Sequence, residues 1–345
     1  MQLRFQSVYE PRPDGNWLKL LSRHWSAYEK WFLSEGDAAR PSYLKTRQML
    51  RKHMPELMPT YERLVDLAGG SDMTARFLGH YCPPPYISGC SQAIWPDPDQ
   101  ALLIRNYDYS PSLCEGTLLY SCWNGRKVIA MSDCLWGVLD GMNDAGLAVS
   151  LSFGGRRVVG EGFGVPLILR YILEFCETVE EATRALGRIP THMSYNVTVL
   201  DKSNQYRTAF VSPDRRVVIR QLPVATNHQG RVEWQTHAEA TASTERESFL
   251  INRLADSEET EGNFIDSFLQ PPLYSTAYKR GFGTLYTAWY RPQEGEMALM
   301  WPGSSLVQNF TNFTEESRTI RYDGITEEVD EVQASQHERA SLMAL

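Results

Sequence analysis

The sequence predicts an α+β layered sandwich, with two antiparallel sheets between outer layers of helix, preceded by a helical N-terminal segment. Three observations lead to this fold class. The first eighty residues have helical periodicity, the sequence changes abruptly to short strand-like runs just before Cys90, and blocks of strands and helices then follow one another. We therefore divide the chain into a helical segment (1–89), a sandwich domain (90–314) and a loosely ordered acidic tail (315–345).

The N-terminal segment shows helical spacing in two long stretches. Apolar residues recur every three or four positions over 17–31, which is typical of an amphipathic helix, and the pattern repeats over 42–68. Pro55 and Pro59 should kink or split the second stretch. A glycine pair then ends it, and a Ser-Asp pair can cap a third, short helix over 71–81.

Strand-like sequence begins after the proline-rich residues 82–86, which cannot form a helix. Short β-prone runs separated by turn signals occupy 90–95, 101–109, 117–123, 127–133 and 146–153. A helix over 165–186 and a second strand set follow, the latter at 196–201, 206–212 and 216–226. Two helices, at 242–256 and 263–270, and a hairpin from 283 to 301 complete the series. The residues after about 315 are charged and poorly periodic.

Composition narrows the classes of function. A formal net charge of -8 disfavours nucleic acid or an anionic membrane as partner. The N-terminus lacks the apolar core of a signal peptide, and no apolar run reaches membrane-spanning length, so we expect a cytoplasmic protein. Most of the six cysteines are expected to be small buried hydrophobes. A zinc site built from His80, Cys82 and Cys90 would lack a second ligand pair, so we expect no metal and no cofactor.

Residues 89–111 hold the most informative pattern. Cys90 opens one strand-like run, and Arg105 begins Arg-Asn-Tyr-Asp on the next, after a Pro-Asp turn. A hairpin of this length returns its second strand to the start of the first. Alternation then puts Arg105 on one face, and Asn106 and Asp108 on the other. The residues alone leave open whether this is a reactive site or a structural ion pair.

The Gly-Cys-Ser start followed by Arg-Asn-Tyr-Asp resembles the linear-amide hydrolases of the N-terminal-nucleophile (Ntn) superfamily. This group includes bile salt hydrolases, penicillin V acylases and the acyl-coenzyme A:6-aminopenicillanic acid acyltransferases (peptidase family C45). The acyltransferases are most similar, because they too carry a helical prosegment that ends in Gly before the nucleophilic Cys. Three further segments resemble the family in the expected order: residues 141–150, Thr226-Asn227-His228 and Ser243-Thr244-Glu245-Arg246.

The resemblance implies an Ntn-hydrolase αββα sandwich and self-cleavage between Gly89 and Cys90. Glycine at the junction would tolerate a strained backbone during the attack. Cleavage would free a Cys90 that carries both a thiol nucleophile and an α-amine able to act as a base near neutral pH. The detached prosegment would remain a partner of the catalytic domain, and a homo-oligomer is possible.

The resemblance also assigns roles to four other residues. Arg105 would favour the Cys90 thiolate, and Asp108 would orient the amine. Asn227 would donate a hydrogen bond to the oxyanion, and Arg246 would hold either a substrate carboxylate or Asp108.

The same comparison places three residues in the substrate pocket. Asn143 lies in the segment that borders it, and Ser152 and Phe153 stand near the position where bile salt hydrolases have an Asn. This difference argues against bile salts as substrates. We expect instead a linear, non-peptide amide, or an acyl thioester, with an apolar acyl group that passes through a thioester on Cys90.

The sequence is also compatible with two other hypotheses. Cys90 and His228 could form a Cys/His hydrolase of papain type, although such enzymes place their Cys at the start of a helix and residues 90–100 do not resemble one. The chain could also be a catalytically inactive scaffold or binding protein that keeps the fold.

Overall fold

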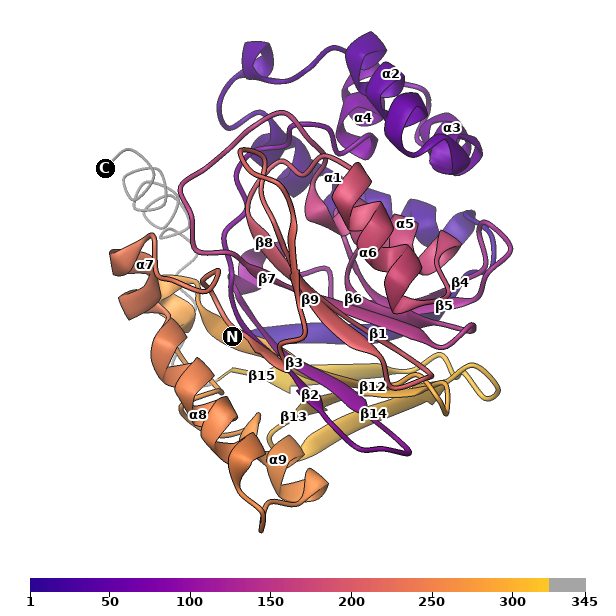
Figure 1. Ribbon diagram of the computed structural model, residues 1–345. Helices are drawn as coiled ribbons and strands as arrows, with labels where there is room; N and C mark the ends of the chain where they lie inside the picture. Colours follow the sequence, from indigo (N-terminus) through magenta and orange to yellow (C-terminus); the bar gives the residue numbers. More distant parts are fainter. Residues whose placement is uncertain (323–345) are drawn as a thin grey trace.

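In the computed structural model, which describes residues 1–322, two β-sheets stack face to face and helices cover their outer faces (Figure 1). The predicted α+β architecture of two sheets with helices outside is therefore confirmed. Helices α5 and α6 pack on the larger sheet, and α8 packs on the smaller one.

Within residues 1–322 the strands are β1 (Gln2–Tyr9), β2 (Gly89–Trp95), β3 (Leu102–Tyr109), β4 (Thr117–Ser121), β5 (Val128–Asp133), β6 (Gly137–Asn143), β7 (Leu147–Phe153), β8 (Tyr195–Asp201), β9 (Tyr206–Val211), β10 (Val218–Arg220), β11 (Val224–Ala225), β12 (Gly283–Arg291), β13 (Glu296–Trp301), β14 (Ser304–Asn309) and β15 (Ser317–Arg321). The α-helices are α1 (Gly15–Phe32), α2 (Tyr43–His53), α3 (Met58–Leu67), α4 (Asp72–Leu78), α5 (Val165–Phe175), α6 (Val179–Arg188), α7 (Gln235–Ala240), α8 (Ser243–Ala255) and α9 (Glu261–Ser267).

The larger sheet has nine strands in the order β10-β9-β8-β7-β6-β5-β4-β1-β15, and the smaller has six in the order β11-β2-β3-β12-β13-β14. Neighbouring strands are antiparallel, except that β1 runs parallel to β4.

Both ends of the described chain differ from the sequence-based expectation. Helix was expected throughout the first eighty residues, but Gln2–Tyr9 form β1, which lies between β4 and β15 inside the larger sheet. The alternation is hard to see in the sequence because one inward position is polar: Ser7 is buried, and its hydroxyl donates to the Thr314 carbonyl at 2.7 Å. Ser317–Arg321, expected as tail, form β15 against β1. Residues 323–345 of the predicted tail lie outside the described residues.

The helical part of the N-terminal segment follows the prediction closely. The prolines split the second stretch into α2 and α3, and the Ser71 side chain caps α4 by accepting the Thr74 N–H. The single helix expected over 165–186 is instead the pair α5 and α6. Thr178 stands between them and caps α6 by accepting the Glu181 N–H, so the second helix begins anew at that point.

The β2–β3 hairpin positions the site, and its alternation is as predicted. Leu103 and Tyr107 on β3 face the core between the sheets, and Arg105 shares their face. Leu102 and Ile104 face the outer helices, and Asn106 shares that face, donating to the carbonyls of Phe268 and Leu273. The hairpin therefore presents different side chains to the inter-sheet core and to the layer of α8 and α9.

Every helix within residues 1–322 is too short or too polar to span a lipid bilayer.

Candidate active site

Cys90 lies one residue into β2, directly opposite Tyr107 of β3, with its thiol fully buried between the two sheets. Arg105 reaches it from the same face, and its Nη2 donates to the Cys90 Sγ at 3.1 Å. The Cys–Arg proximity expected from the hairpin is thus present.

Asp140, on β6 of the opposite sheet, binds the second terminal nitrogen of the Arg105 guanidinium. Its Oδ2 accepts from Arg105 Nη1 at 2.8 Å and from the Tyr286 hydroxyl at 2.6 Å, and its Oδ1 accepts from the Tyr290 hydroxyl. Both members of the Arg105–Asp140 ion pair are fully buried. Sequence reasoning missed Asp140. The available signal was a single carboxylate within the otherwise apolar and small residues of 137–142.

A second group of side chains surrounds the Cys90 backbone from the helix side. Arg246, on α8, donates from Nη1 to the Ser91 hydroxyl at 2.7 Å and from Nη2 to the Asn227 Oδ1 at 2.7 Å. Its Nη1 also lies 3.6 Å from the Asp108 Oδ2. Of the two roles expected for Arg246, the geometry favours holding Asp108, because its donors are occupied by protein groups. Asp108 also accepts from the Thr284 hydroxyl at 2.7 Å.

Asn227 contacts the chain on both sides of the Gly89–Cys90 bond. Its Oδ1 accepts the Cys90 backbone N–H at 3.0 Å, and its Nδ2 donates to the Ser88 carbonyl at 3.2 Å and to the Phe153 carbonyl at 3.1 Å. The structure therefore brings Cys90, Arg105, Asp108, Asn227 and Arg246 into one buried, connected cluster.

Burial dominates the electrostatics of this cluster. Burial raises the pKa of the Cys90 thiol, and although Arg105 acts in the opposite direction as expected, it does not overcome the loss of solvation. Burial also raises the pKa of Asp108 to about 6, against the opposing effects of Arg246 and the Thr284 hydrogen bond. In the continuous chain, the thiol is accordingly held in its protonated form.

The preference for glycine at position 89 comes from the limited space for a side chain and not from backbone strain. It is the first residue of β2 and pairs with Asp108, and its φ is outside the left-handed region. A Cβ at this position would lie 3.3 Å from the Asp108 Cβ. Glycine therefore permits the close approach of Asp108 to the junction.

In this structure the three residues expected in the substrate pocket make buried contacts that stabilise the fold. Asn143 ties the β6–β7 turn to the end of α5, donating to the carbonyls of Leu173 and Cys176. The Ser152 hydroxyl donates to the Thr226 carbonyl at 2.6 Å. Phe153 is fully buried, and its ring packs on aromatic side chains while its carbonyl accepts from Asn227.

His228 is oriented for a different role from that of a base for Cys90. Its Nδ1 lies 2.9 Å from the Ser243 hydroxyl, and its Nε2 lies 3.1 Å from the Glu247 carboxylate. Both ring nitrogens are thus engaged, which disfavours the Cys/His hydrolase reading.

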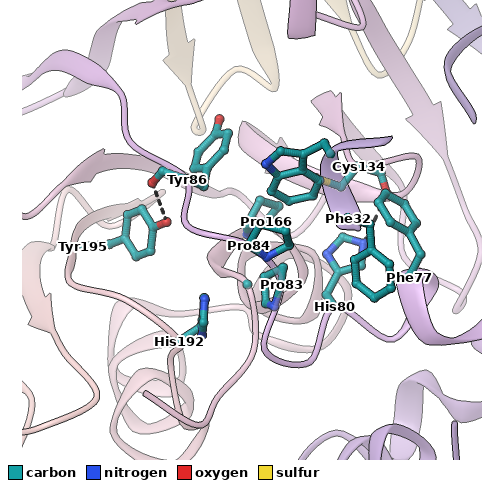
Figure 2. A pocket seen from close by; sticks show the side chains of 12 residues that line it. Phe32, Phe77, His80, Pro83, Pro84, Tyr86, Cys134, Pro166, His192 and Tyr195 are labelled. Carbon is teal, nitrogen blue, oxygen red and sulfur yellow. Dashed lines mark hydrogen bonds between the residues drawn. The ribbon is translucent and has the colours of Figure 1, made fainter. Parts of the chain in front are cut away.

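An apolar pocket lies where the N-terminal segment meets the sandwich (Figure 2). Aromatic and proline side chains from both parts line it, among them Phe32, Phe77, Pro84, Tyr86, Pro166 and Tyr195. The Tyr195 hydroxyl donates to the Tyr86 carbonyl at 3.1 Å, and the Tyr86 hydroxyl bonds that of Tyr107, the residue opposite Cys90. A short aromatic wall thus connects the pocket to the cluster.

In the part of the chain that the structure describes, no group of three His, Cys, Asp or Glu side chains is arranged to hold a metal ion. His80, considered above as a zinc ligand, directs its Nε2 to the Cys134 carbonyl at 3.1 Å.

Several solved structures resemble this one at low sequence identity. Penicillin V acylase from Agrobacterium tumefaciens is 14% identical, with 69% of this chain and 94% of that chain covered and a TM-score of 0.47. A mutant of conjugated bile acid hydrolase from Clostridium perfringens is 12% identical, covering 70% and 100%, with a TM-score of 0.42. The Caenorhabditis elegans ortholog of N-acylethanolamine-hydrolyzing acid amidase is 18% identical, covering 59% and 93%, with a TM-score of 0.44.

A search of curated proteins finds no match. The model of one protein family, however, matches residues 95–305, which is more than half of the chain. The chain therefore belongs to the acyl-coenzyme A:6-aminopenicillanic acid acyl-transferase family.

Proposed function

We propose that this chain is the precursor of a cysteine Ntn amidase or acyltransferase that cleaves itself between Gly89 and Cys90. The observation that carries the proposal is the cluster around this one peptide bond. Arg105 contacts the thiol on one side of β2, while Asn227 holds the amide N–H of the same residue.

Cleavage would proceed by attack of the Cys90 sulfur on the Gly89 carbonyl carbon. The C–N bond breaks, the nitrogen takes up the proton released by the thiol, and a thioester to Gly89 forms. Water then opens the thioester, which leaves a carboxylate on Gly89 and restores the thiol beside a free α-amine. Burial favours the neutral thiol beforehand, so the proton leaves only as the attack takes place.

The contacts of Asn227 suit two successive roles. In the continuous chain its Nδ2 donates to the Ser88 carbonyl, so this N–H becomes free if the cut end moves away. It could then donate to the oxyanion that develops on a substrate carbonyl, while Oδ1 keeps hold of the Cys90 nitrogen. Asp108 would orient the new amine, and Arg246, whose Nη1 lies 3.6 Å from the Asp108 Oδ2, would hold that carboxylate in place.

The substrate we propose is a linear, non-peptide amide with an apolar acyl group. In the uncut chain the aromatic pocket beside Tyr86 has room for about one water molecule, so the acyl group would enter it only after lining side chains of the N-terminal segment move. The acyl-enzyme would be a thioester on Cys90, which water or an amine can open. The same site could thus hydrolyse amides and transfer acyl groups, as the family's name implies for its members.

Intact mass spectrometry of freshly purified protein tests the cleavage. We expect two chains, residues 1–89 and 90–345, whereas a Cys90→Ala variant should remain one chain. Efficient cleavage of Cys90→Ala would refute the mechanism, and an uncut wild type would favour the scaffold reading.

A panel of N-acyl amides and acyl thioesters tests the chemistry. The chain that begins with Cys90 should transiently gain the mass of the acyl group during turnover. Turnover that persists after complete alkylation of Cys90 would rule out the thioester.

A further inference from the structure

Three side chains outside the proposed chemistry form a continuous hydrogen-bonded chain beside Asn227. Ser243 is fully buried, with its Oγ 2.9 Å from the Nδ1 of His228, which is also buried. The Nε2 of His228 lies 3.1 Å from the carboxylate of the partly exposed Glu247. The order hydroxyl, imidazole, carboxylate is that of a nucleophile triad, so its role here must be decided from the direction of its protons.

The partners at each end fix that direction. Nε2 faces a carboxylate, which can only accept, so the imidazole proton of neutral His228 sits on Nε2 and Nδ1 is an acceptor. The Thr226 hydroxyl, 3.0 Å from the Ser243 Oγ, donates to the Ser243 carbonyl at 2.9 Å, so the Ser243 hydroxyl is the donor left for Nδ1. The Ser243 Oγ uses a lone pair to accept the Asn227 backbone N–H, at 2.8 Å. Because Ser243 is enclosed and its oxygen already serves Asn227, the hydroxyl is not available as a nucleophile.

The chain is instead a link between two groups of the cluster. Ser243 is the first residue of α8, and Arg246 lies one turn later on the same helix. Arg246 donates to the Oδ1 of Asn227, whose backbone N–H bonds Ser243. Asn227 is thus held to one helix turn by its side chain and by its backbone, and the same Oδ1 accepts the Cys90 N–H.

We propose that His228 is a positioning residue that acts through Ser243 on Asn227. By accepting the hydrogen bond of the Ser243 hydroxyl, His228 keeps a lone pair of the Ser243 oxygen directed at the Asn227 N–H. The consequence for the reaction rests on the proposed self-cleavage at Cys90, but the consequence for the geometry of Asn227 does not.

Two substitutions at His228 separate the possibilities. His228→Asn keeps an acceptor where Nδ1 stands, whereas His228→Leu fills similar space without one. If His228 positions Asn227, His228→Leu should slow cleavage at Gly89–Cys90 by about tenfold, the value of one buried hydrogen bond, while His228→Asn should stay within about threefold of wild type. Glu247→Gln, which can still accept from Nε2, should also stay within about threefold.

Coupling to Ser243 gives a second readout that a merely structural residue would not produce. Ser243→Ala should slow cleavage about as much as His228→Leu, and the double variant should be no slower than Ser243→Ala alone. Additive losses would overturn the proposal, as would wild-type cleavage in His228→Leu. Equal loss in His228→Asn and His228→Leu would also overturn it, and would favour the imidazole as a base.

A readout without cleavage completes the test. In the uncut Cys90→Ala background, hydrogen exchange of the peptide that contains Asn227 should be faster with His228→Leu than with His228→Asn. If wild type fails to cleave, the proposed function fails, and the exchange comparison still decides whether His228 positions Asn227. Equal exchange in the two variants would refute the positioning role.

Discussion

Replacing Asp140 by Asn should destabilise the protein strongly, because Asp140 is the buried counter-charge of Arg105. Both side chains are fully buried, and Asp140 accepts hydrogen bonds from Arg105 and from the Tyr286 and Tyr290 hydroxyls. Asparagine is nearly isosteric, but it removes the charge and turns an NH2 group toward at least one of these donors. An uncompensated buried charge typically costs about 3–5 kcal/mol, and we expect a loss of that size.

The measurement is the free energy of unfolding by urea, made in the Cys90→Ala background so that a single chain unfolds. Asp144→Asn is a matched control in the turn after β6. Its side chain is 34% exposed and lies 3.9 Å from Arg126, so the change should cost less than about 1 kcal/mol. Tyr286→Phe removes one hydrogen bond to the carboxylate and should cost roughly 1.5–3 kcal/mol, which gives a measurable step if Asp140→Asn does not fold.

A loss for Asp140→Asn no larger than that for Asp144→Asn would refute this reasoning. It would mean that Arg105 finds its compensation elsewhere, and that Asp140 does not fix the guanidinium beside the Cys90 thiol.

Four more predictions concern the site and the two chains that cleavage would produce. If self-cleavage requires ionised Asp108, the rate followed by mass spectrometry should fall as the pH drops through about 6, since the raised pKa leaves the carboxyl protonated below that value; a constant rate from about pH 8 to about pH 5 would exclude this requirement. Asn227→Ala should lower kcat about a hundredfold with little change in KM, and a change confined to KM would instead make Asn227 a substrate-binding residue. After cleavage, residues 1–89 should co-elute with the remainder in gel filtration and separate only in denaturant, because β1 lies inside the larger sheet; separation in native buffer would contradict this. Arg105→Lys should cleave far more slowly than wild type, because a single ammonium cannot bond both Asp140 and the thiol as the guanidinium does; a wild-type rate by mass spectrometry would show that a point charge is enough.

Local sequence signals were sufficient for much of the fold and for the core of the site. Alternation along β3 separates Arg105 from Asp108, and prolines and capping residues set the breaks between helices. Relations that cross from one sheet to the other could not be predicted in this way. Asp140 meets Arg105 only because two sheets stack, and β1 is a strand only because β4 and β15, far away in the chain, pair with it. Local signals also could not predict the contacts of Ser243, because its partners Asn227 and His228 lie on a separate loop.

The pairing of β1 with β15 brings the first residue of the chain beside the last described one. The Met1 ammonium donates to the Tyr322 carbonyl at 3.1 Å, and the Tyr322 N–H donates to the Met1 carbonyl at 2.8 Å. In a variant shortened to residues 1–322, a short linker from Tyr322 to Met1 would therefore close the described fold into a ring without disturbing the sheet. Opening that ring before Cys90 would give a circular permutant in which Cys90 follows the initiator Met directly. Removal of that Met would expose the thiol and α-amine of Cys90 with no self-cleavage. The activity of such a permutant would then show whether the enzyme needs the cleavage itself or only a free N-terminal Cys90.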